Sequence, residues 1–268
     1  MLLGSVCGCG LLLDLDPDLS ALEPDGGVDA AVVGSCGPAR EGGLLAVYRF
    51  DDSLTEDLER APDGVETPPT LFVPGAPGCG RAVSFVSREE ADTGFVVLPP
   101  SDLWNLAQGS IDLFVRVDEH AGAGILSRDA FGAVEPGHLS LLISSSGHLA
   151  LRVQTEESPI DEAVCAADPV PLGVWVHVGI HFGAAVELFV DGRLQAWVGT
   201  LDTGIPGLVF ACGAGASDRS IAGNAEPWVI GAGSWASTMN SATPTRAPFV
   251  GAVDHLRFWS SIVAFEGD

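Results

Sequence analysis

The sequence contains no lysine: all 12 of its basic residues are arginine, against 36 aspartate and glutamate residues. The formal net charge is therefore −24 at pH 7. Nucleic acids and anionic membrane surfaces are bound by clustered positive charge, so this composition argues against both as partners. It favours solubility and a surface that tolerates or binds cations.

Long runs with helical periodicity are also lacking. From residue 44 onward, short alternating segments are separated by Gly- and Pro-rich turns, a pattern typical of an all-β sandwich. Apolar residues alternate cleanly over 174–182. Asp191-Gly192 then supplies the two positive-φ residues of a type I′ turn, which predicts that Val190 pairs with Arg193.

A second hairpin is predicted over 138–154. A three-residue loop that ends at Gly147 keeps the apolar residues in phase and pairs Ile143 with Leu149. Strict alternation in the last strand would place Asp254 on the same face as Phe258. Further strands are predicted over 44–50, 80–86, 94–98, 110–118, 124–127, 227–231 and 249–259.

The chain divides into three parts. Residues 1–13 are apolar, too short to span a bilayer, and without the basic region of a signal peptide. Val6–Cys9 nevertheless resembles a bacterial lipobox, and a start codon placed too late would explain the missing basic residues. We therefore expect lipidation at Cys9 and an outer-membrane lipoprotein or a secreted protein; the alternative is an apolar tail on a cytosolic protein. Residues 14–43 are a predicted disordered, acidic Pro/Gly-rich linker, and 44–268 form the folded domain.

The order of the folded segments carries a resemblance to a known family. The segments are YRFDDS (48–53), GRAVSFV (80–86), FVVLP (95–99), GSIDLFVRVD (109–118), GILSRD (124–129), VWVHVGIHF (174–182), LFVDGRL (188–194), WVIGAG (228–233) and FVGAVDHLRFW (249–259). Together they resemble the LamG-like domain of the concanavalin A-like lectin/glucanase superfamily. The resemblance implies a jelly-roll sandwich of two antiparallel sheets, one of them concave. It does not fix a function, because this fold hosts lectins, adhesion modules and glycosidases.

A paired-carboxylate motif for glycoside hydrolysis is missing. Hydrolases of this superfamily carry Glu-x-Asp-x-x-Glu on one strand, which places nucleophile and acid on the same face. Glu90-Ala91-Asp92 begins this motif, but Phe95 stands where the third carboxylate belongs. We therefore predict a non-catalytic binding module that recognises carbohydrate or a cell-surface protein. A divergent glycoside hydrolase is the alternative.

Calcium is the metal that the resemblance implies, because many domains of the family bind one Ca²⁺ through loop carboxylates and backbone carbonyls. Asp51 and Asp57 follow the first strand, and Asp254 occupies the acidic position of the closing strand. The alternative is that Asp254 binds backbone groups while the other two are solvated. By contrast, His177 and His181 would lie about 13 Å apart on a strand, which excludes a metal pair.

Two tryptophans are assigned as candidate sugar-stacking residues: Trp235, in an irregular loop, and Trp104. Four cysteines lie beyond the N-terminal segment, and they allow three disulfide pairings. We favour Cys165–Cys212, because these two bracket the central hairpin. An exported protein would form disulfides, whereas a cytosolic one would retain buried thiols.

Overall fold

The computed structural model describes residue 36 and residues 42–67, 70–86, 94–129, 137–154, 162–213, 217–233 and 247–265. These residues belong to one compact unit, Val32–Asp268. Within them the only helix is a short 3-10 turn, η2 (Asp102–Trp104), so none is long and apolar enough to cross a membrane. Cys9 and nearly all of the predicted linker lie outside the described residues.

The strands form two sheets of nine strands each within the described residues. Sheet A contains β1 (Leu44–Tyr48), β3 (Leu71–Pro74), β4 (Arg81–Phe85), β6 (Gly109–Val117), β11 (Trp175–Ala185), β12 (Glu187–Val190), β13 (Arg193–Leu194), β16 (Ser217–Arg219) and β18 (Gly251–Trp259). Their order is β13-β12-β11-β6-β18-β4-β3, with β1 beside β18 and β16 beside β11.

Sheet B contains β2 (Val65–Thr67), β5 (Phe95–Leu98), β7 (Ala123–Arg128), β8 (His138–Ile143), β9 (Leu149–Gln154), β10 (Glu162–Cys165), β14 (Gly199–Asp202), β15 (Val209–Cys212) and β17 (Trp228–Ile230). Their order is β14-β15-β10-β9-β8-β7-β17-β5-β2. All pairs in this sheet are antiparallel except β10 and β15, which run parallel and so correct the expectation of purely antiparallel sheets.

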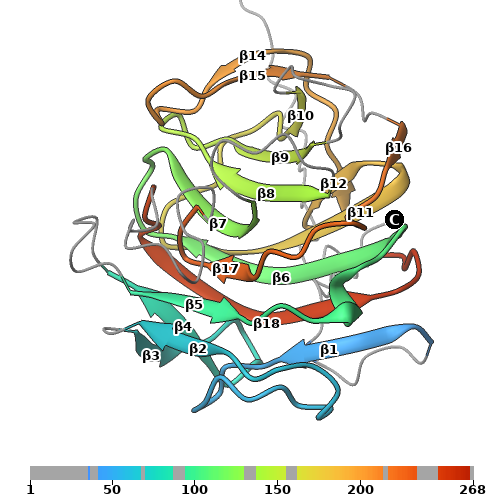
Figure 1. Cartoon of the computed structure of the whole chain (residues 1–268). Coiled ribbons are helices and arrows are strands. Elements are labelled where there is room, and N and C mark those ends of the chain that lie inside the picture. Colours follow the sequence, from blue (N-terminus) through green and yellow to red (C-terminus); the bar gives the residue numbers. More distant parts are fainter. Residues whose placement is uncertain are drawn as a thin grey trace, which may run out of the picture. The chain divides into compact units, whose positions relative to one another are not determined.

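The two sheets pack face to face, as Figure 1 shows, and their inner faces share one core. Ile111 and Val178 of sheet A belong to the same buried cluster as Leu141 and Leu151 of sheet B. Burial of these side chains removes apolar surface from water, which is the main favourable term in folding. The predicted all-β, two-sheet sandwich is therefore confirmed.

Both predicted hairpin registers are confirmed. Asp191 and Gly192 have φ angles of 50° and 72°, and Val190 lies opposite Arg193. In the hairpin of β8 and β9, Ile143 lies opposite Leu149, Leu141 opposite Leu151 and Leu139 opposite Val153. Gly147 has a φ of 86°, the left-handed conformation that the three-residue loop requires.

The strict alternation predicted for the closing strand is wrong. A bulge in β18 shifts its register against β6 between Asp254 and Arg257, and His255 adopts a left-handed φ of 50°. The extra residue returns Phe258 to the core, while Asp254 and Arg257 stay on the outer face of sheet A. Two charged side chains are thereby placed on one surface by a local irregularity.

Candidate functional site

The outer face of sheet B carries a row of polar side chains. In β8 and β9 the leucines and valines of one register face the core. The alternation of strand side chains therefore turns His138, Ser140, Arg152 and Gln154 away from it. His138 lies opposite Gln154, and Ser140 opposite Arg152. Together with Asp129, which follows β7, these four residues are called the polar row below.

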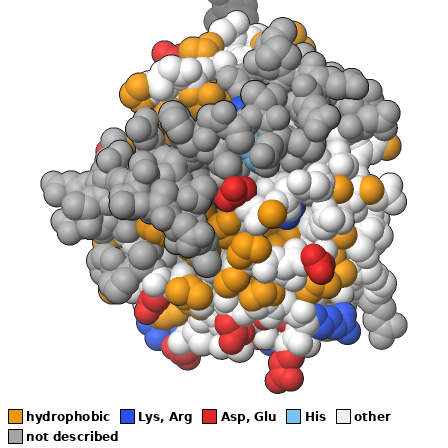
Figure 2. Space-filling view, in the orientation of Figure 1, with side chains coloured by type: hydrophobic (Ala, Val, Ile, Leu, Met, Phe, Trp, Pro, Cys, Tyr) orange, Lys and Arg blue, Asp and Glu red, His pale blue; other side chains and the backbone are white. Residues whose placement is uncertain are grey.

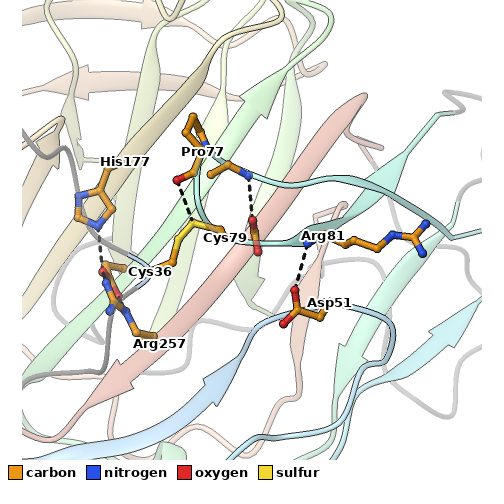
Figure 3. Close-up of a disulfide and its surroundings, with 10 residues drawn as sticks. Cys36, Asp51, Pro77, Cys79, Arg81, His177 and Arg257 are labelled. Atoms are coloured by element: carbon orange, nitrogen blue, oxygen red, sulfur yellow. Dashed lines mark hydrogen bonds and ion pairs between the residues drawn. A yellow bond between two sulfur atoms is a disulfide. The ribbon is translucent and has the colours of Figure 1, made fainter. Parts of the chain in front are cut away.

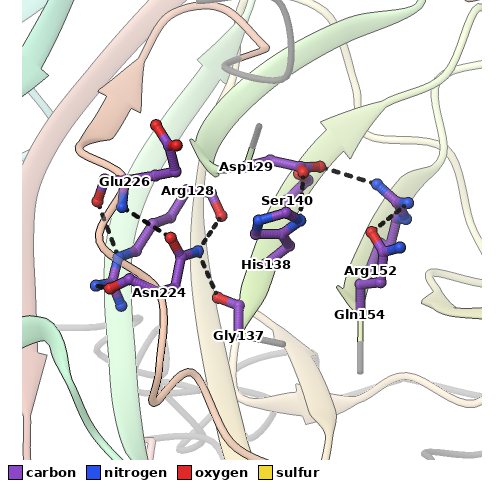
Figure 4. A network of polar contacts seen from close by, with 9 residues as sticks. All are labelled: Arg128, Asp129, Gly137, His138, Ser140, Arg152, Gln154, Asn224 and Glu226. Atoms are coloured by element: carbon purple, nitrogen blue, oxygen red, sulfur yellow. Dashed lines mark hydrogen bonds and ion pairs between the residues drawn. The ribbon is translucent and has the colours of Figure 1, made fainter. Parts of the chain in front are cut away.

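Asp129 holds the polar row together, as Figure 4 shows. Its Oδ2 lies 2.8 Å from Nη1 of Arg152 and accepts a 3.2 Å hydrogen bond from Ser140 Oγ. Arg152 Nη2 donates in turn to Gln154 Oε1 at 2.8 Å. Nδ1 of His138 lies 2.9 Å from Asp129 Oδ1, at ion-pair distance but outside hydrogen-bond geometry. The guanidinium is therefore fixed by a carboxylate and an amide.

The members of the polar row differ in burial. Asp129, His138 and Ser140 are buried, whereas Arg152 keeps 17% of its side chain exposed and Gln154 is half-buried. Nε2 of His138 is buried without a hydrogen-bond partner. An unmet polar atom in a buried position costs free energy, so such atoms often mark functional positions. Arg152 and Gln154 are therefore the more exposed members of the polar row, and Asp129, His138 and Ser140 lie beneath the surface.

An aromatic pair lies on the same face. Trp197 is half-buried and packs on the cluster that contains Leu142, Ala150 and Cys165. Its ring stacks on His148, with centroids 5.7 Å apart and planes inclined by 20°. Ala150 lies two residues before Arg152 on the same face of β9, about 7 Å away. A flat aromatic surface therefore lies near the polar row.

The polar row has one carboxylate, which limits its chemistry. Hydrolysis of a glycosidic bond by the usual retaining or inverting route needs two carboxyl groups on opposite sides of the scissile bond. Asp129 is already bound to Arg152 and Ser140. The row offers hydrogen-bond donors and acceptors of the kind that sugar hydroxyls match, and it has no second carboxyl group.

Two of the three predicted calcium ligands lie on either side of one loop. Residues 75–80 connect β3 and β4, and a side-chain carbon at Gly75 or Gly80 would overlap with Asp254 or Asp51, respectively. Oδ2 of Asp254 accepts a 2.9 Å hydrogen bond from the Ala76 N–H, and Oδ1 of Asp51 accepts one of 3.1 Å from the Arg81 N–H (Figure 3). Both carboxylates therefore contact the backbone of this loop.

Asp254 is a buried carboxyl whose hydrogen-bonding capacity is only partly used. Its side chain is buried, and its Oδ1 has no hydrogen-bond partner. Burial raises the pKa of this carboxyl to about 7; hydrogen bonds from the Ala76 and His255 backbone oppose the rise, and Asp51 adds to it. A cation that prefers oxygen ligands, such as Ca²⁺, would relieve both effects at Oδ1.

Asp57 does not lie close enough to Asp254 and Asp51 for the three carboxylates to share one metal ion. Its Oδ2 accepts a 3.1 Å hydrogen bond from the Arg49 N–H. Burial, first, and then the neighbouring carboxylates Glu56 and Asp51 raise its pKa against the opposing effect of Arg49. Among the described residues, the only three donors of a metal-ligating kind within 4.8 Å of one another are Cys36, Cys79 and His255.

The assignment of Trp104 to sugar stacking is wrong, and Trp235 lies outside the described residues. Trp104 is fully buried against Phe258 at a centroid distance of 4.8 Å, and its Nε1 donates to Pro99 O. It therefore presents no surface to a ligand. Among the described residues Trp175 and Trp197 are the half-buried tryptophans, and sequence reasoning selected neither.

The remaining sequence-predicted residues are placed as follows. Cys165 and Cys212 form a disulfide with Cα atoms 5.6 Å apart, the pairing that the sequence favours. Cys36, which falls in the predicted linker, forms a second disulfide with Cys79. His177 and His181 are buried sheet histidines that contact carboxylates, Asp112 and Glu187 respectively.

The molecule is acidic as a whole: with a net charge of −24 it repels anions at a distance. Figure 2 shows one face, with acidic side chains and a few basic ones along its lower margin and apolar side chains above them.

Two packed β-sheets with a polar row and an aromatic pair on one outer face define a lectin-like sandwich. The chain belongs to the concanavalin A-like lectin/glucanase superfamily, whose Laminin G family model matches residues 90–264. No curated protein matches the sequence.

Several solved structures share the fold. Domain 4 of AbnA, an extracellular arabinanase of Geobacillus stearothermophilus solved in complex with arabinotriose, is similar with a TM-score of 0.56 and 19% identity over 81% of this chain and 92% of that domain. A botulinum neurotoxin type C structure, from a toxin whose cell entry depends on interaction with two ganglioside molecules, has a TM-score of 0.54 and 13% identity. The match covers 82% of this chain but about half, 48%, of the neurotoxin chain.

Proposed function

We propose that the protein is a non-catalytic binding module that recognises carbohydrate on the outer face of sheet B. The observation that carries the proposal is Arg152, 17% exposed and fixed by Asp129 and Gln154, on the same face of sheet B as the half-buried Trp197. The guanidinium and amide hydrogen-bond sugar hydroxyls, and the indole stacks on the apolar face of a sugar ring. The arabinotriose complex of AbnA domain 4 supports this proposal.

The net charge narrows the ligand class. Acidic polysaccharides would be repelled by a molecule of charge −24, and the partly exposed Arg152 does not reverse that field. We therefore propose a neutral glycan as the preferred ligand. A cell-surface protein remains the alternative partner, and the synaptotagmin complex of a related neurotoxin binding domain supports that alternative.

A glycan array of neutral and acidic oligosaccharides tests the proposal. Arg152→Ala and Trp197→Ala should each abolish binding of the glycans that the native protein retains. Matched controls come from sheet A: Arg116→Ala and Trp175→Ala change a half-buried arginine and tryptophan that contact each other there. Loss of binding in the control pair, or retention in the sheet B pair, would refute the site.

A turnover assay distinguishes a non-catalytic binding module from the alternative, a divergent glycoside hydrolase. Each retained glycan is incubated with the protein, and released reducing ends are measured. We expect binding without release, because the polar row has one carboxylate. Release that disappears in Asp129→Asn would overturn the non-catalytic assignment.

We also propose a structural Ca²⁺ bound by Asp254 and Asp51 with backbone carbonyls of the loop that joins β3 and β4. The unpartnered Oδ1 of the buried Asp254 supports it. Calcium should raise the melting temperature of the native protein, and EDTA should reverse the rise. Asp254→Asn should abolish this response, whereas Asp57→Asn should retain it. Identical melts with calcium and with EDTA would exclude the ion.

Export is the proposed location, with Cys9 as the site of lipidation or the chain secreted. Two disulfides support an oxidising compartment, because cytosolic reductants keep most thiols reduced. Cell fractionation and mass spectrometry of the N-terminal peptide test this proposal. A lipid-modified Cys9 that disappears in Cys9→Ser would establish the anchor, and recovery of the protein in the cytosol would refute export.

A further inference from the structure

Three soft metal ligands meet on the outer face of sheet A. The sulfur atoms of Cys36 and Cys79 and a ring nitrogen of His255 all lie within 4.8 Å of one another. The two cysteines are joined in a disulfide, with Cα atoms 5.2 Å apart (Figure 3). A disulfide alone needs no histidine beside it, so the third ligand requires an explanation.

Separate parts of the sequence bring these residues together. Cys79 lies in the tight turn before β4, where its N–H donates to Ala76 O at 2.8 Å. His255 occupies the bulge of β18, and Cys36 comes from the segment before β1. His255 and Cys79 are 3% and 6% exposed, so the cluster is largely shielded from water.

His255 has ligand capacity that the fold does not use. Its Nδ1 is buried and has no hydrogen-bond partner. A buried imidazole normally hydrogen-bonds through its ring nitrogens, because an unmet one costs free energy. The disulfide sulfurs are poor partners for it. Thiolates at the same positions would instead share a metal ion with it.

We propose that Cys36, Cys79 and His255 form a zinc site that is closed while the Cys36–Cys79 disulfide exists and opens when it is reduced. Two thiolates and one imidazole form a known zinc donor set, with a fourth position left for water. The two thiolate charges neutralise Zn²⁺, which suits a site shielded from water. Thiolate sulfur also selects zinc against the harder calcium.

A dithiol can act as the reductant that opens the Cys36–Cys79 disulfide. The dithiol transfers two electrons to the Cys36–Cys79 bond and becomes a disulfide itself, and its two protons leave the two cysteines as thiols. Zn²⁺ then displaces those two protons as it binds both sulfurs. Reoxidation reverses the sequence and releases the ion. The site therefore couples metal occupancy to the redox state of the chain.

Cobalt and zinc titrations of the full chain test the site. Cys7 and Cys9 are replaced by serine in every sample, so that the N-terminal thiols bind no metal. The protein is reduced with a phosphine, desalted without oxygen and titrated with Co²⁺. We expect about one Co²⁺ per chain with thiolate charge-transfer and tetrahedral absorption bands, displaced by Zn²⁺. The oxidised protein should show neither band.

His255→Asn is the decisive variant, because asparagine tolerates the left-handed backbone at this position. It should weaken zinc binding about tenfold or more. His148→Asn is its matched control: His148 stacks on Trp197 beside the other cysteine pair and should leave zinc binding unchanged. Circular dichroism checks that each variant is folded.

Cys36→Ser should abolish the cobalt bands. Bands that persist in this variant would place the metal on Cys165 and Cys212 and overturn the proposal. Two other outcomes overturn it as well: a reduced protein that binds no metal, and equal zinc affinity of His255→Asn and His148→Asn. If Cys36→Ser does not fold, the histidine pair decides the question alone.

Discussion

The two outer faces of the sandwich carry the same arrangement, an aspartate between a histidine and an arginine. On sheet A, Asp112 binds Arg257 through both carboxylate oxygens and lies 2.9 Å from Nε2 of His177. On sheet B, Asp129 lies 2.8 Å from Arg152 and 2.9 Å from His138. Because the two arrangements contain the same three residue types, the difference between their surroundings shows what sets them apart.

The sheet A arrangement is closed by protein. Phe265, in the segment after β18, contacts His177 and His181 at centroid distances of 5.8 and 4.9 Å. Val263 O of the same segment lies 2.8 Å from His181 Nε2. Arg257 is held against the Trp259 ring, and 9% of its side chain is exposed. Every group of this network contacts another part of the chain, so its role is stability.

The sheet B arrangement leaves its arginine more accessible. Arg152 is 17% exposed, about twice the value of Arg257, and it reaches toward Gln154 at the strand end. The same carboxylate–guanidinium pair can therefore support a fold or present a ligand-binding group. The two roles differ in whether other parts of the chain cover the arginine.

The largest expected effect is the loss of the buried carboxylate on sheet A. Asp112→Asn leaves the Arg257 cation buried without its counter-charge, which should lower the free energy of unfolding by about 3–5 kcal/mol. Urea unfolding at neutral pH measures it. Asp52→Asn is the control, because Asp52 pairs with Arg81 at an exposed position and should cost about 0–1 kcal/mol. Equal unfolding midpoints would show that the sheet A network contributes nothing.

Removal of the cover over sheet A should come next. Phe265 is 4% exposed, and its ring fills the space that the missing side chain of Gly179 leaves. Phe265→Ala should therefore cost about 3 kcal/mol. Hydrogen exchange should show faster opening around β11 and β12. Glycan binding should persist, because the binding face is on the other sheet; its loss would mean that the two faces are coupled.

Much of the fold could be predicted from the sequence, because the inner strands have one apolar face. The Asp191-Gly192 turn predicted the register of one hairpin, and the alternation around Leu141 with a three-residue loop predicted that of the other. Several short strands were not predicted from the sequence: β2, β3, β10, β14, β15 and β16. These strands are only three or four residues long, and some expose apolar residues such as Leu71 and Val209, so they give no sustained apolar signature. The bulge at His255 escaped because a left-handed histidine has no sequence signal of its own.

The site was less accessible to sequence reasoning, because its residues come from three strands. Asp129, His138 and Arg152 meet only when β7, β8 and β9 pair, and no spacing in the sequence encodes that pairing. One signal was present: the outward positions of the second hairpin hold His138, Ser140 and Arg152. Trp104 was assigned wrongly because no pattern in the sequence shows that the 3-10 turn buries it.

A smaller loss is expected for the carboxylate on sheet B. Asp129→Asn should lower the free energy of unfolding by about 1–3 kcal/mol, because the freed Arg152 can turn toward water. Glycan affinity should fall as well, since the guanidinium is no longer fixed. Denaturant unfolding and glycan titration measure the two effects. A cost equal to that of Asp112→Asn would mean that both faces are equally closed.

The smallest effect on stability is expected for Arg152→Lys. Lysine keeps the charge but cannot contact Asp129 and Gln154 at once, so the unfolding free energy should change by no more than about 0.5 kcal/mol while glycan affinity falls. Arg257→Lys is the matched change on sheet A. It breaks a two-point contact with Asp112 in a closed network and should destabilise without affecting glycan binding. If the two lysine variants exchanged these phenotypes, the closed face would be the binding face.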